Sequence, residues 1–414
     1  MITTDGGPGG HGVRSRRLFI AGLGIGQICS WGSLYYSFPL IAEAMERDLG
    51  YSKPEIYGAA TLGLALSGLA AYPVGSAIDR GQGRMVMTAG SVLAGLLLLA
   101  WSQVDSLALF YVLFAGIGLL QAATLYEPAF AVTARRFGAG NARHAITMLT
   151  LWGGFASTVF VPLVQFLLDE LGWRGALAVL GGVNLVLCAG LYFAVIDPAA
   201  DAPAEVRADG EGVPVPGRAA LAHALRSPVF WALALSFTAY AATFSVITFH
   251  LYPLLLERGF DTQTVVSAIA IIGPAQVAGR VAIWILAPRA SVRAIGSVTV
   301  AALPLSLLAL ELIAPSFAAL AAVAVAYGAA NGIMTIVRGM AVPEMLTREA
   351  YGAINGALAA PATVAKALAP AGAALLWAAA GSYDAVLLAA IAGSLAILAG
   401  FWIAVVWSRP AASC

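Results

Sequence analysis

The sequence is poor in charged residues. Asp, Glu, Lys and Arg make up 10% of its 414 residues, and 60% are hydrophobic, whereas a soluble domain has about 25% charged residues. There are only two lysines, Lys53 and Lys366, and the net charge is +1. This composition excludes an ordinary soluble domain, and no basic segment indicates a nucleic-acid partner.

Cysteine and histidine are also scarce. Cys29, Cys188 and Cys414 lie far apart, so their spacing predicts neither a disulfide framework nor a metal site. The four histidines occur at separate places and form no catalytic cluster. With no glycine-rich phosphate loop, we expect no cofactor, no metal, no enzymatic activity and no ATP-driven step.

Long apolar runs fill most of the chain, and each is long enough to cross the ~30 Å hydrocarbon core as a helix. We therefore predict an all-α integral membrane protein with twelve transmembrane helices. The first run follows Arg14, Arg16 and Arg17 but is longer than the apolar region of a signal peptide. We interpret it as a retained first helix. The expected spans are 18–42, 53–77, 85–103, 107–134, 144–168, 174–196, 228–256, 262–287, 293–313, 316–342, 351–380 and 384–407.

The distribution of basic residues predicts the orientation. With both termini inside, fifteen Arg lie on the cytoplasmic side and four Arg or Lys on the other, a strong positive-inside bias. Abundant Ala, Gly and Arg with little Lys is typical of a GC-rich bacterial genome. We expect a multi-pass protein of the bacterial inner membrane with cytoplasmic termini.

One polar segment interrupts the apolar pattern. Residues 197–227 are rich in Pro, Ala and Gly and predict a cytoplasmic linker. They separate two six-helix halves, 18–196 and 228–407, flanked by cytoplasmic tails at 1–17 and 408–414. The halves share a weak repeat that aligns Arg80 with Arg289 and Arg84 with Arg293, as in many transporters.

A short motif after the second span resembles one of the major facilitator superfamily. In "GSAIDRGQGR", five positions match the pattern Gly-x-x-x-Asp-Arg-x-Gly-Arg, with one extra residue before the second glycine: Gly75, Asp79, Arg80, Gly83 and Arg84. The resemblance implies two pseudo-symmetric six-helix halves and a gating role for the motif. Asp79 would latch onto the positive N-terminus of the eleventh helix, or the motif is an ordinary positive-inside loop.

Within the superfamily, the stretch "YEPAFAVTARRFGAGNARHAITMLTLWGGFAS" resembles the monocarboxylate and oxalate–formate branch. Arg280 on the eighth helix and Lys366 on the eleventh add to the likeness. Several bacterial efflux groups share similar stretches, so this second resemblance is looser.

Five ionisable residues lie inside the predicted spans, where a charge costs a few kcal/mol: Glu127, His250, Arg280, Arg338 and Lys366. All are on helices that surround the central cavity in the superfamily. Three cations face one acid, and buried charges need partners. An anionic substrate between Arg280 and Lys366 would supply the missing negative charge, with Arg280 as a bidentate donor.

Each residue has an alternative role. Arg280 would brace neighbouring helices, and Lys366 would form a fixed pair with Glu127. Glu127 is otherwise a candidate for proton coupling, and Arg338 for structural charge pairing. His250 either titrates during transport or is a hydrogen-bonding residue near the membrane surface.

Aromatic residues recur with helical spacing on two helices that are symmetry mates in the superfamily. Trp31 and Tyr35 share a face of the first helix, and Tyr240 and Phe244 share a face of the seventh. These stripes either contact the substrate or pack within the bundle.

These features together favour a secondary active transporter. We expect it to move a small mono- or dicarboxylate by alternating access as a monomer in the lipid bilayer, coupled to protons or a counter-anion. The main alternative is an efflux pump for an arsenical or drug-like molecule. A membrane sensor or enzyme is less well supported.

Overall fold

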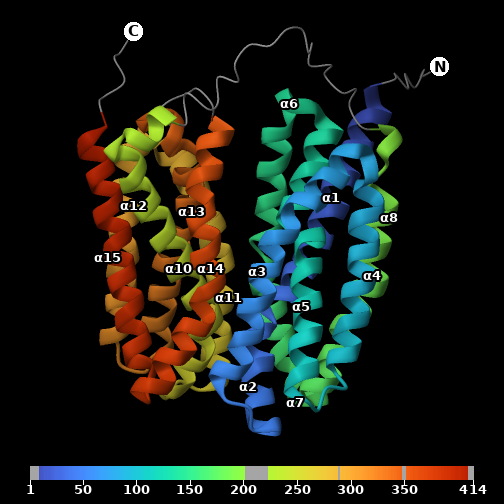
Figure 1. Ribbon diagram of the computed structural model, residues 1–414, viewed down its shortest axis with the longest axis vertical. Coiled ribbons are helices and arrows are strands. Elements are labelled where there is room, and N and C mark those ends of the chain that lie inside the picture. The colour runs from blue at the N-terminus through green and yellow to red at the C-terminus, as the bar shows by residue number, and fades with distance from the viewer. Residues whose placement is uncertain (1–8, 201–221, 288–289, 347–350, 409–414) are drawn as a thin grey trace, which may run out of the picture. The chain divides into compact units, whose positions relative to one another are not determined.

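The computed structural model describes residues 9–200, 222–287, 290–346 and 351–408, and every regular element among them is helical (Figure 1). This confirms the all-α prediction. Most of the expected linker, 197–227, lies outside the described residues, so the division of the chain at that segment stays a prediction.

The helices form two compact units. Unit 1 comprises residues 1–37, 66–160 and 166–206, and unit 2 comprises 38–65, 161–165 and 207–414. The end of the first predicted span and the start of the second therefore belong to the unit that contains the second half of the chain. Helices α3 and α7 contribute to both units.

The elements of the first half, in chain order, are α1 (Gly9–Trp31), η1 (Gly32–Tyr36), α2 (Phe38–Leu49), α3 (Lys53–Ala77), η2 (Ile78–Gln82), α4 (Gly83–Trp101), α5 (Leu107–Thr124), α6 (Tyr126–Gly153), α7 (Ala156–Gly182), η3 (Val183–Cys188), α8 (Ala189–Val195) and η4 (Pro198–Ala200). Those of the second half are α10 (Pro228–Glu257), α11 (Thr262–Leu286), α12 (Val292–Leu312), α13 (Phe317–Met345), α14 (Tyr351–Ala380) and α15 (Tyr383–Trp407).

Ten continuous helical segments of the described residues are long and apolar enough to span a membrane. Two of them, 53–101 and 145–195, contain 49 and 51 residues, about twice the length that one crossing needs. Each is interrupted by a glycine with positive φ, Gly81 at 87° and Gly172 at 66°. Each of these two segments is long enough for two crossings, and the expected count of twelve spans stays a prediction.

Helix starts follow local capping rules. The Ser52 N–H donates to the Glu55 carboxylate at 2.8 Å before α3, which is the glutamate half of a capping box. Asp261 caps α11, because its carboxylate accepts the Thr264 N–H at 2.9 Å. Hydrogen bonds from the Thr264 side chain and then its backbone lower the pKa of Asp261 from the ordinary value.

In unit 1, α1 packs closely against α8 because glycines remove side-chain bulk. A Cβ on Gly22 would lie 2.5 Å from Val195, and one on Gly26 would lie 2.4 Å from the Tyr192 ring. This confirms the close approach that small residues four apart allow in membrane helices. The Gln27 amide donates to the Tyr192 hydroxyl at 3.0 Å and to the carbonyl of residue 124 at 2.8 Å.

In unit 2, α11 and α13 approach until their backbones touch. A Cβ on Gly332 would lie 2.1 Å from the carbonyl oxygen of Gln276, and one on Gly279 would lie 2.6 Å from that of Ala329. Beside them, α10 packs against α14 and α15, and α12 packs against α13 and α15. This packing fixes the side chains that α10, α11 and α13 project.

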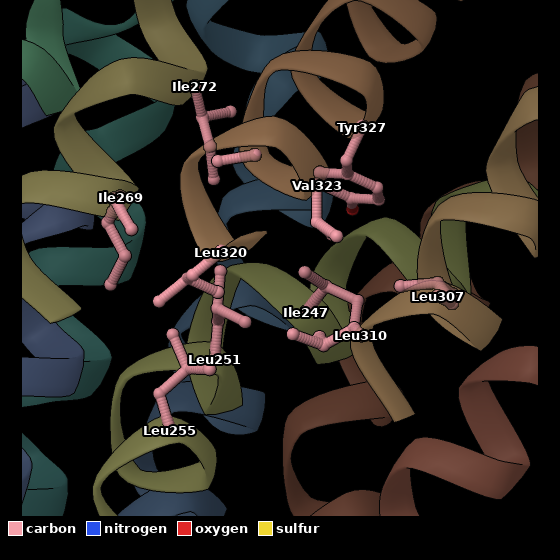
Figure 2. A pocket seen from close by; sticks show the side chains of 12 residues that line it. Ile247, Leu251, Leu255, Ile269, Ile272, Leu307, Leu310, Leu320, Val323 and Tyr327 are labelled. Atoms are coloured by element: carbon pink, nitrogen blue, oxygen red, sulfur yellow. The ribbon is translucent and has the colours of Figure 1, made fainter. Parts of the chain in front are cut away.

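Two cavities in unit 2 are apolar. One, between α10, α11, α12 and α13, is lined by residues such as Ile247, Leu251 and Tyr327 (Figure 2) and has about 20 Å³ of room, enough for one water molecule. The other, of about 440 Å³, is lined mainly by Ala, Gly and Leu of α10, α14 and α15. No charged side chain lines either of these two cavities, so neither is the predicted anion site.

Candidate substrate site

Arg280 lies near the end of α11, half-buried against α13. Its Nε donates to the carbonyl oxygen of Gly332 at 3.1 Å, and its Nη2 donates to the Thr335 hydroxyl at 3.2 Å. The glycine allows this approach, because a side chain at position 332 would collide with α11. The guanidinium is therefore held by neutral groups on a neighbouring helix.

Arg338 lies on α13, nearly two turns after Gly332, and its side chain packs against aromatic rings. Its guanidinium carbon is 5.6 Å from the centroid of Tyr240 and 5.8 Å from that of Phe237, within the range of cation–π attraction. In the described part of the chain, no acidic side chain pairs with Arg338. The acid partner suggested by the sequence is therefore not seen among these residues.

Tyr240 joins the two arginines. Its hydroxyl donates to the Asn331 Oδ1 at 3.0 Å, and both Arg280 and Arg338 lie close enough to the phenol to interact with it electrostatically. Phe244, one turn along α10, stacks on Tyr240 with centroids 6.0 Å apart. We call Tyr240, Arg280, Asn331, Thr335 and Arg338 the arginine cluster.

Lys366 lies in the middle of α14, where its backbone carbonyl accepts the Ser245 hydroxyl at 2.8 Å. Its side chain is half-buried. The anion-binding role that the sequence suggests for Lys366 stays a prediction, as do the roles of the other candidate residues.

In unit 1, Trp31 is surrounded by aromatic rings. Its ring centroid is 4.9 Å from that of Tyr126 and 5.1 Å from that of Tyr35. Tyr35 is 2% exposed and lies in the π-helical turn η1, which breaks the regular α-helical spacing on which the predicted stripe rests. The Trp31 Nε1 and the Gln27 Oε1 are buried without a hydrogen-bond partner among the described residues.

Glu127 lies in the first turn of α6 and is exposed within the structure. The positive end of a helix dipole favours a carboxylate at that position. This environment explains how an acid is tolerated there, and the proposed proton-coupling role stays a prediction.

The motif after the second span forms the turn between α3 and α4. Arg135 donates to the carbonyl oxygen of Asp79 at 2.5 Å, Arg80 to the Ser76 hydroxyl at 2.8 Å and Arg84 to the carbonyl oxygen of Phe193 at 2.7 Å. Gly81, beside the extra residue in the motif, takes a φ of 87°, a left-handed conformation that suits glycine. Gly83 packs against Val132, whereas Gly75 has open space around it. The latch of Asp79 onto α14 stays a prediction.

His250 is completely buried in α10 and bonded at both ring nitrogens. Its Nε2 is 2.9 Å from the carbonyl oxygen of Pro370, and its Nδ1 is 3.1 Å from the Tyr383 hydroxyl. Its ring stacks on Tyr57. Because a carbonyl can only accept, Nε2 carries a proton and the neutral ring accepts from Tyr383 at Nδ1.

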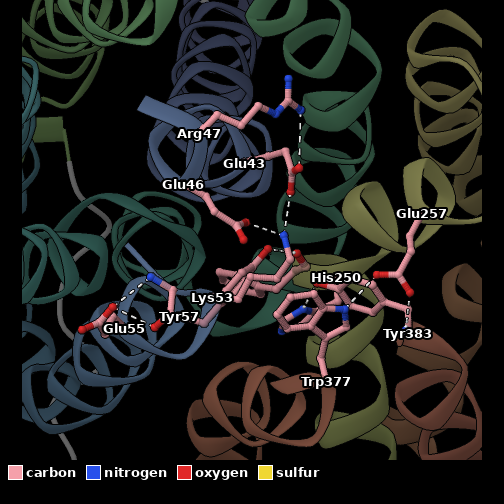
Figure 3. Close-up of polar contacts among 12 residues, drawn as sticks. Glu43, Glu46, Arg47, Lys53, Glu55, Tyr57, His250, Glu257, Trp377 and Tyr383 are labelled. Carbon is pink, nitrogen blue, oxygen red and sulfur yellow. Dashed lines mark hydrogen bonds and ion pairs between the residues drawn. The ribbon is translucent and has the colours of Figure 1, made fainter. Parts of the chain in front are cut away.

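A second group of charged residues in unit 2 was missed by sequence reasoning (Figure 3). Lys53 forms ion pairs with Glu43, at 3.0 Å, and Glu46, and its Nζ lies 5.1 Å from the Trp377 ring. We call these four residues the Lys53 cluster. The available signal was that Lys53 is one of only two lysines in the chain.

The sequence profile of the Major Facilitator Superfamily matches residues 23–303, more than half of the chain. The chain belongs to this superfamily. Its members are membrane transporters and not enzymes, which is the class of protein that the sequence predicted.

Curated relatives of this superfamily member share modest identity with it. Monocarboxylate transporter 11 of Homo sapiens is 32% identical over 288 residues, covering 66% of this chain and 57% of the relative. Monocarboxylate transporter 13 of Bos taurus is 29% identical over 351 residues, covering 83% and 76%. The chain thus spans little more than half the length of the first relative, and the resemblance to the monocarboxylate branch is confirmed as a resemblance.

Solved structures confirm the superfamily fold. The nucleoside transporter NupG superimposes with a TM-score of 0.74 at 12% identity, covering 94% of this chain and 98% of that one. A bacterial homolog of the human lysosomal transporter Spinster gives 0.68 at 13% identity, covering 95% and 96%. At such identities these similarities concern the fold alone.

Proposed function

We propose that this protein is a secondary active transporter of small carboxylates. The observation that carries the proposal is the arginine cluster, in which two guanidinium groups from α11 and α13 converge on Tyr240 inside apolar spans. The interior positions of α10, α11, α13 and α14 contain Arg280, Arg338 and Lys366, and their nearest acids, Glu257 and Glu344, stand near helix ends. A substrate carboxylate suits this region because Arg338 has no acidic partner among the described residues.

The named relatives support the same substrate class. Monocarboxylate transporters 11 and 13 are named for carboxylates, and arginine forms two parallel hydrogen bonds with a carboxylate. We propose that Arg280 and Lys366 hold the carboxylate and that Phe244 packs against its apolar part. In unit 1, the substrate contact expected for Trp31 stays a prediction; its buried N–H lacks an acceptor among the described residues.

Transport proceeds by alternating access, coupled to protons or to a counter-anion. The absence of a phosphate-binding loop in the sequence leaves an ion or substrate gradient as the energy source. Both coupling modes offset the charge that the substrate anion carries across the membrane. Exchange requires a counter-anion on the opposite side, whereas proton coupling requires a proton gradient.

The test is uptake of radiolabelled lactate and succinate into proteoliposomes containing the purified protein. We expect uptake of at least one carboxylate, stimulated by a proton gradient or by the same anion inside the vesicle. Arg280→Gln is expected to abolish uptake, whereas Arg47→Gln, at a residue that is 67% exposed, leaves it intact. No carboxylate uptake, together with uptake of an arsenical or a neutral drug-like compound, would overturn the proposal in favour of an efflux pump.

A further inference from the structure

Arg338 belongs to the arginine cluster but is not one of the two residues proposed above to hold the carboxylate, and its surroundings are those of a ligand-binding residue. Its guanidinium lies over two aromatic faces, 5.6 Å from Tyr240 and 5.8 Å from Phe237. Among the described residues it makes no hydrogen bond and no ion pair, and it is half-buried. Five N–H donors are therefore held in position by contacts that use none of them.

The position of Arg338 relative to Arg280 is fixed by the helices that carry them. Thr335 lies one turn before Arg338 on α13 and accepts a hydrogen bond from Arg280 at 3.2 Å. Tyr240 contacts Arg338 through its ring and donates its hydroxyl to Asn331 on the same helix at 3.0 Å. Both arginines are thus anchored to the same stretch of α13: Arg280 through Thr335, and Arg338 by its own position next to the Tyr240 ring.

Such an arrangement favours a ligand with two negative charges. A single carboxylate on Arg280 and Lys366 leaves the Arg338 charge uncompensated, and an unpaired buried charge is costly. A second carboxylate on the same ligand can form a charge-assisted contact with Arg338. Ring contacts remain available to Arg338 whether or not the ligand is bound, so the empty site tolerates the cation.

We propose that Arg338 binds the second carboxylate of a dicarboxylate substrate, so that the transporter selects small dianions over monoanions of equal size. This inference rests on the proposed function, in which Arg280 and Lys366 hold the first carboxylate. Arg338 is then a specificity-determining residue, and Tyr240 is the positioning residue that holds it in place.

Succinate and succinamate provide a matched pair of probes, because they have nearly the same size and differ by one carboxylate. Their binding to the purified full-length protein is measured at pH 7.5 by isothermal titration calorimetry. We expect the unaltered protein to bind succinate about tenfold more tightly than succinamate, since a hydrogen bond to a charged group contributes roughly 1.5–3 kcal/mol.

Arg338→Gln is expected to reduce succinate affinity about tenfold and to leave succinamate affinity unchanged, so that the preference disappears. Arg338→Lys keeps the charge but not the forked geometry and is expected to retain part of the preference. If Arg338→Gln does not yield monodisperse protein, the reduced succinate preference of Arg338→Lys tests the role of Arg338 instead. Arg47→Gln serves as the control for the loss of one arginine.

An unchanged succinate preference in Arg338→Gln, or in Arg338→Lys when only that variant folds, would overturn the assignment of Arg338 and leave the proposed function standing. Tighter binding of succinamate than of succinate by the unaltered protein would do the same. If the unaltered protein binds neither probe nor any other carboxylate, the proposed function itself fails, and this inference fails with it.

Discussion

The imidazole of His250 lies flat against the phenol of Tyr57, with ring centroids 4.1 Å apart and planes inclined by 22°. Tyr57 belongs to the start of α3, and His250 belongs to α10, whose neighbours Pro370 and Tyr383 bond its two nitrogens. The Tyr57 hydroxyl in turn donates to the carbonyl oxygen of Phe249 at 2.9 Å. These contacts favour a structural role for His250.

We expect His250→Ala to lower the free energy of unfolding by about 3 kcal/mol, because it removes two hydrogen bonds and leaves a cavity beside Tyr57. Denaturant unfolding of the purified protein measures this loss. Tyr57→Phe keeps the ring stack and loses only one hydrogen bond, so it is expected to cost about 1 kcal/mol. Normal stability of His250→Ala with an altered pH profile of transport would instead support the proton-coupling role.

Lys53 is expected to stabilise unit 2 strongly. Its side chain is 8% exposed and neutralises both Glu43 and Glu46. Lys53→Met removes the buried cation from both carboxylates and leaves Glu43 only the exposed Arg47, and loss of one partner from a buried pair costs about 3–5 kcal/mol. Thermal unfolding of the variant, together with denaturant unfolding, measures this loss in the free energy of unfolding.

Arg47 is the matched control, because it contacts the same Glu43 at 3.4 Å but is 67% exposed. Arg47→Gln is expected to change the unfolding free energy by less than about 0.5 kcal/mol. The triple variant Lys53→Met, Glu43→Gln and Glu46→Gln should recover much of the loss. Equal effects of Lys53→Met and Arg47→Gln would show that burial of Lys53 is unimportant.

Gly332→Ala should disrupt the contact between α11 and α13. The added Cβ would lie 2.1 Å from the carbonyl oxygen of Gln276, so one helix must shift, at a cost of roughly 1–3 kcal/mol. Gly339→Ala on the same helix has nothing within 4 Å of its Cβ and should be neutral or slightly stabilising, since alanine favours helix. Similar melting temperatures for the two variants would contradict the packing described.

The Asp261 cap predicts a defined pH dependence. Its pKa is lowered by hydrogen bonds from Thr264, so the folded state favours the carboxylate. The resulting stabilisation is present above the ordinary aspartate pKa and is lost as the pH falls through the lowered folded value. The melting-temperature difference between the unaltered protein and Asp261→Ala should therefore be constant at neutral pH and shrink in acid.

Asp261→Asn is the control, because asparagine also caps helices but does not titrate in this range. Its melting temperature relative to Asp261→Ala should show no such decrease in acid. A difference between the unaltered protein and Asp261→Ala that grows as the pH falls would contradict the cap's protonation behaviour.

Much of the fold was predictable because membrane helices depend on length and hydrophobicity, which are properties of continuous sequence. The Asp261 cap and the close approach at Gly22 and Gly26 depend in the same way on residues that lie close together in the sequence. The π-helical turn at 32–36 was not predictable, because a hydrogen-bond shift of one residue leaves no mark in hydropathy. The spacing rule applied to Trp31 and Tyr35 assumed a regular α-helix.

The candidate site was predicted only in part, because its contacts join distant segments. Arg280 and Arg338 were identified by their charge inside apolar spans. Their convergence on Tyr240 depends on how α10, α11 and α13 pack, and sequence spacing does not report that. The Lys53 cluster was missed for the same reason, since Glu43 and Trp377 become neighbours of Lys53 only in the folded chain.

The backbone contact between α11 and α13 also sets a scale for recognition. Gly279 and Gly332 allow the two backbones to pack in direct contact. Arg280 and Arg338 therefore extend from two helices that behave as one rigid body. Because the two backbones are in contact, we expect α11 and α13 to move together, so that the separation of residues 280 and 338 changes little during transport. The protein would thus select dicarboxylates by the distance between their two carboxylates in the same way from both sides of the membrane. Its selectivity would not depend on the direction of transport.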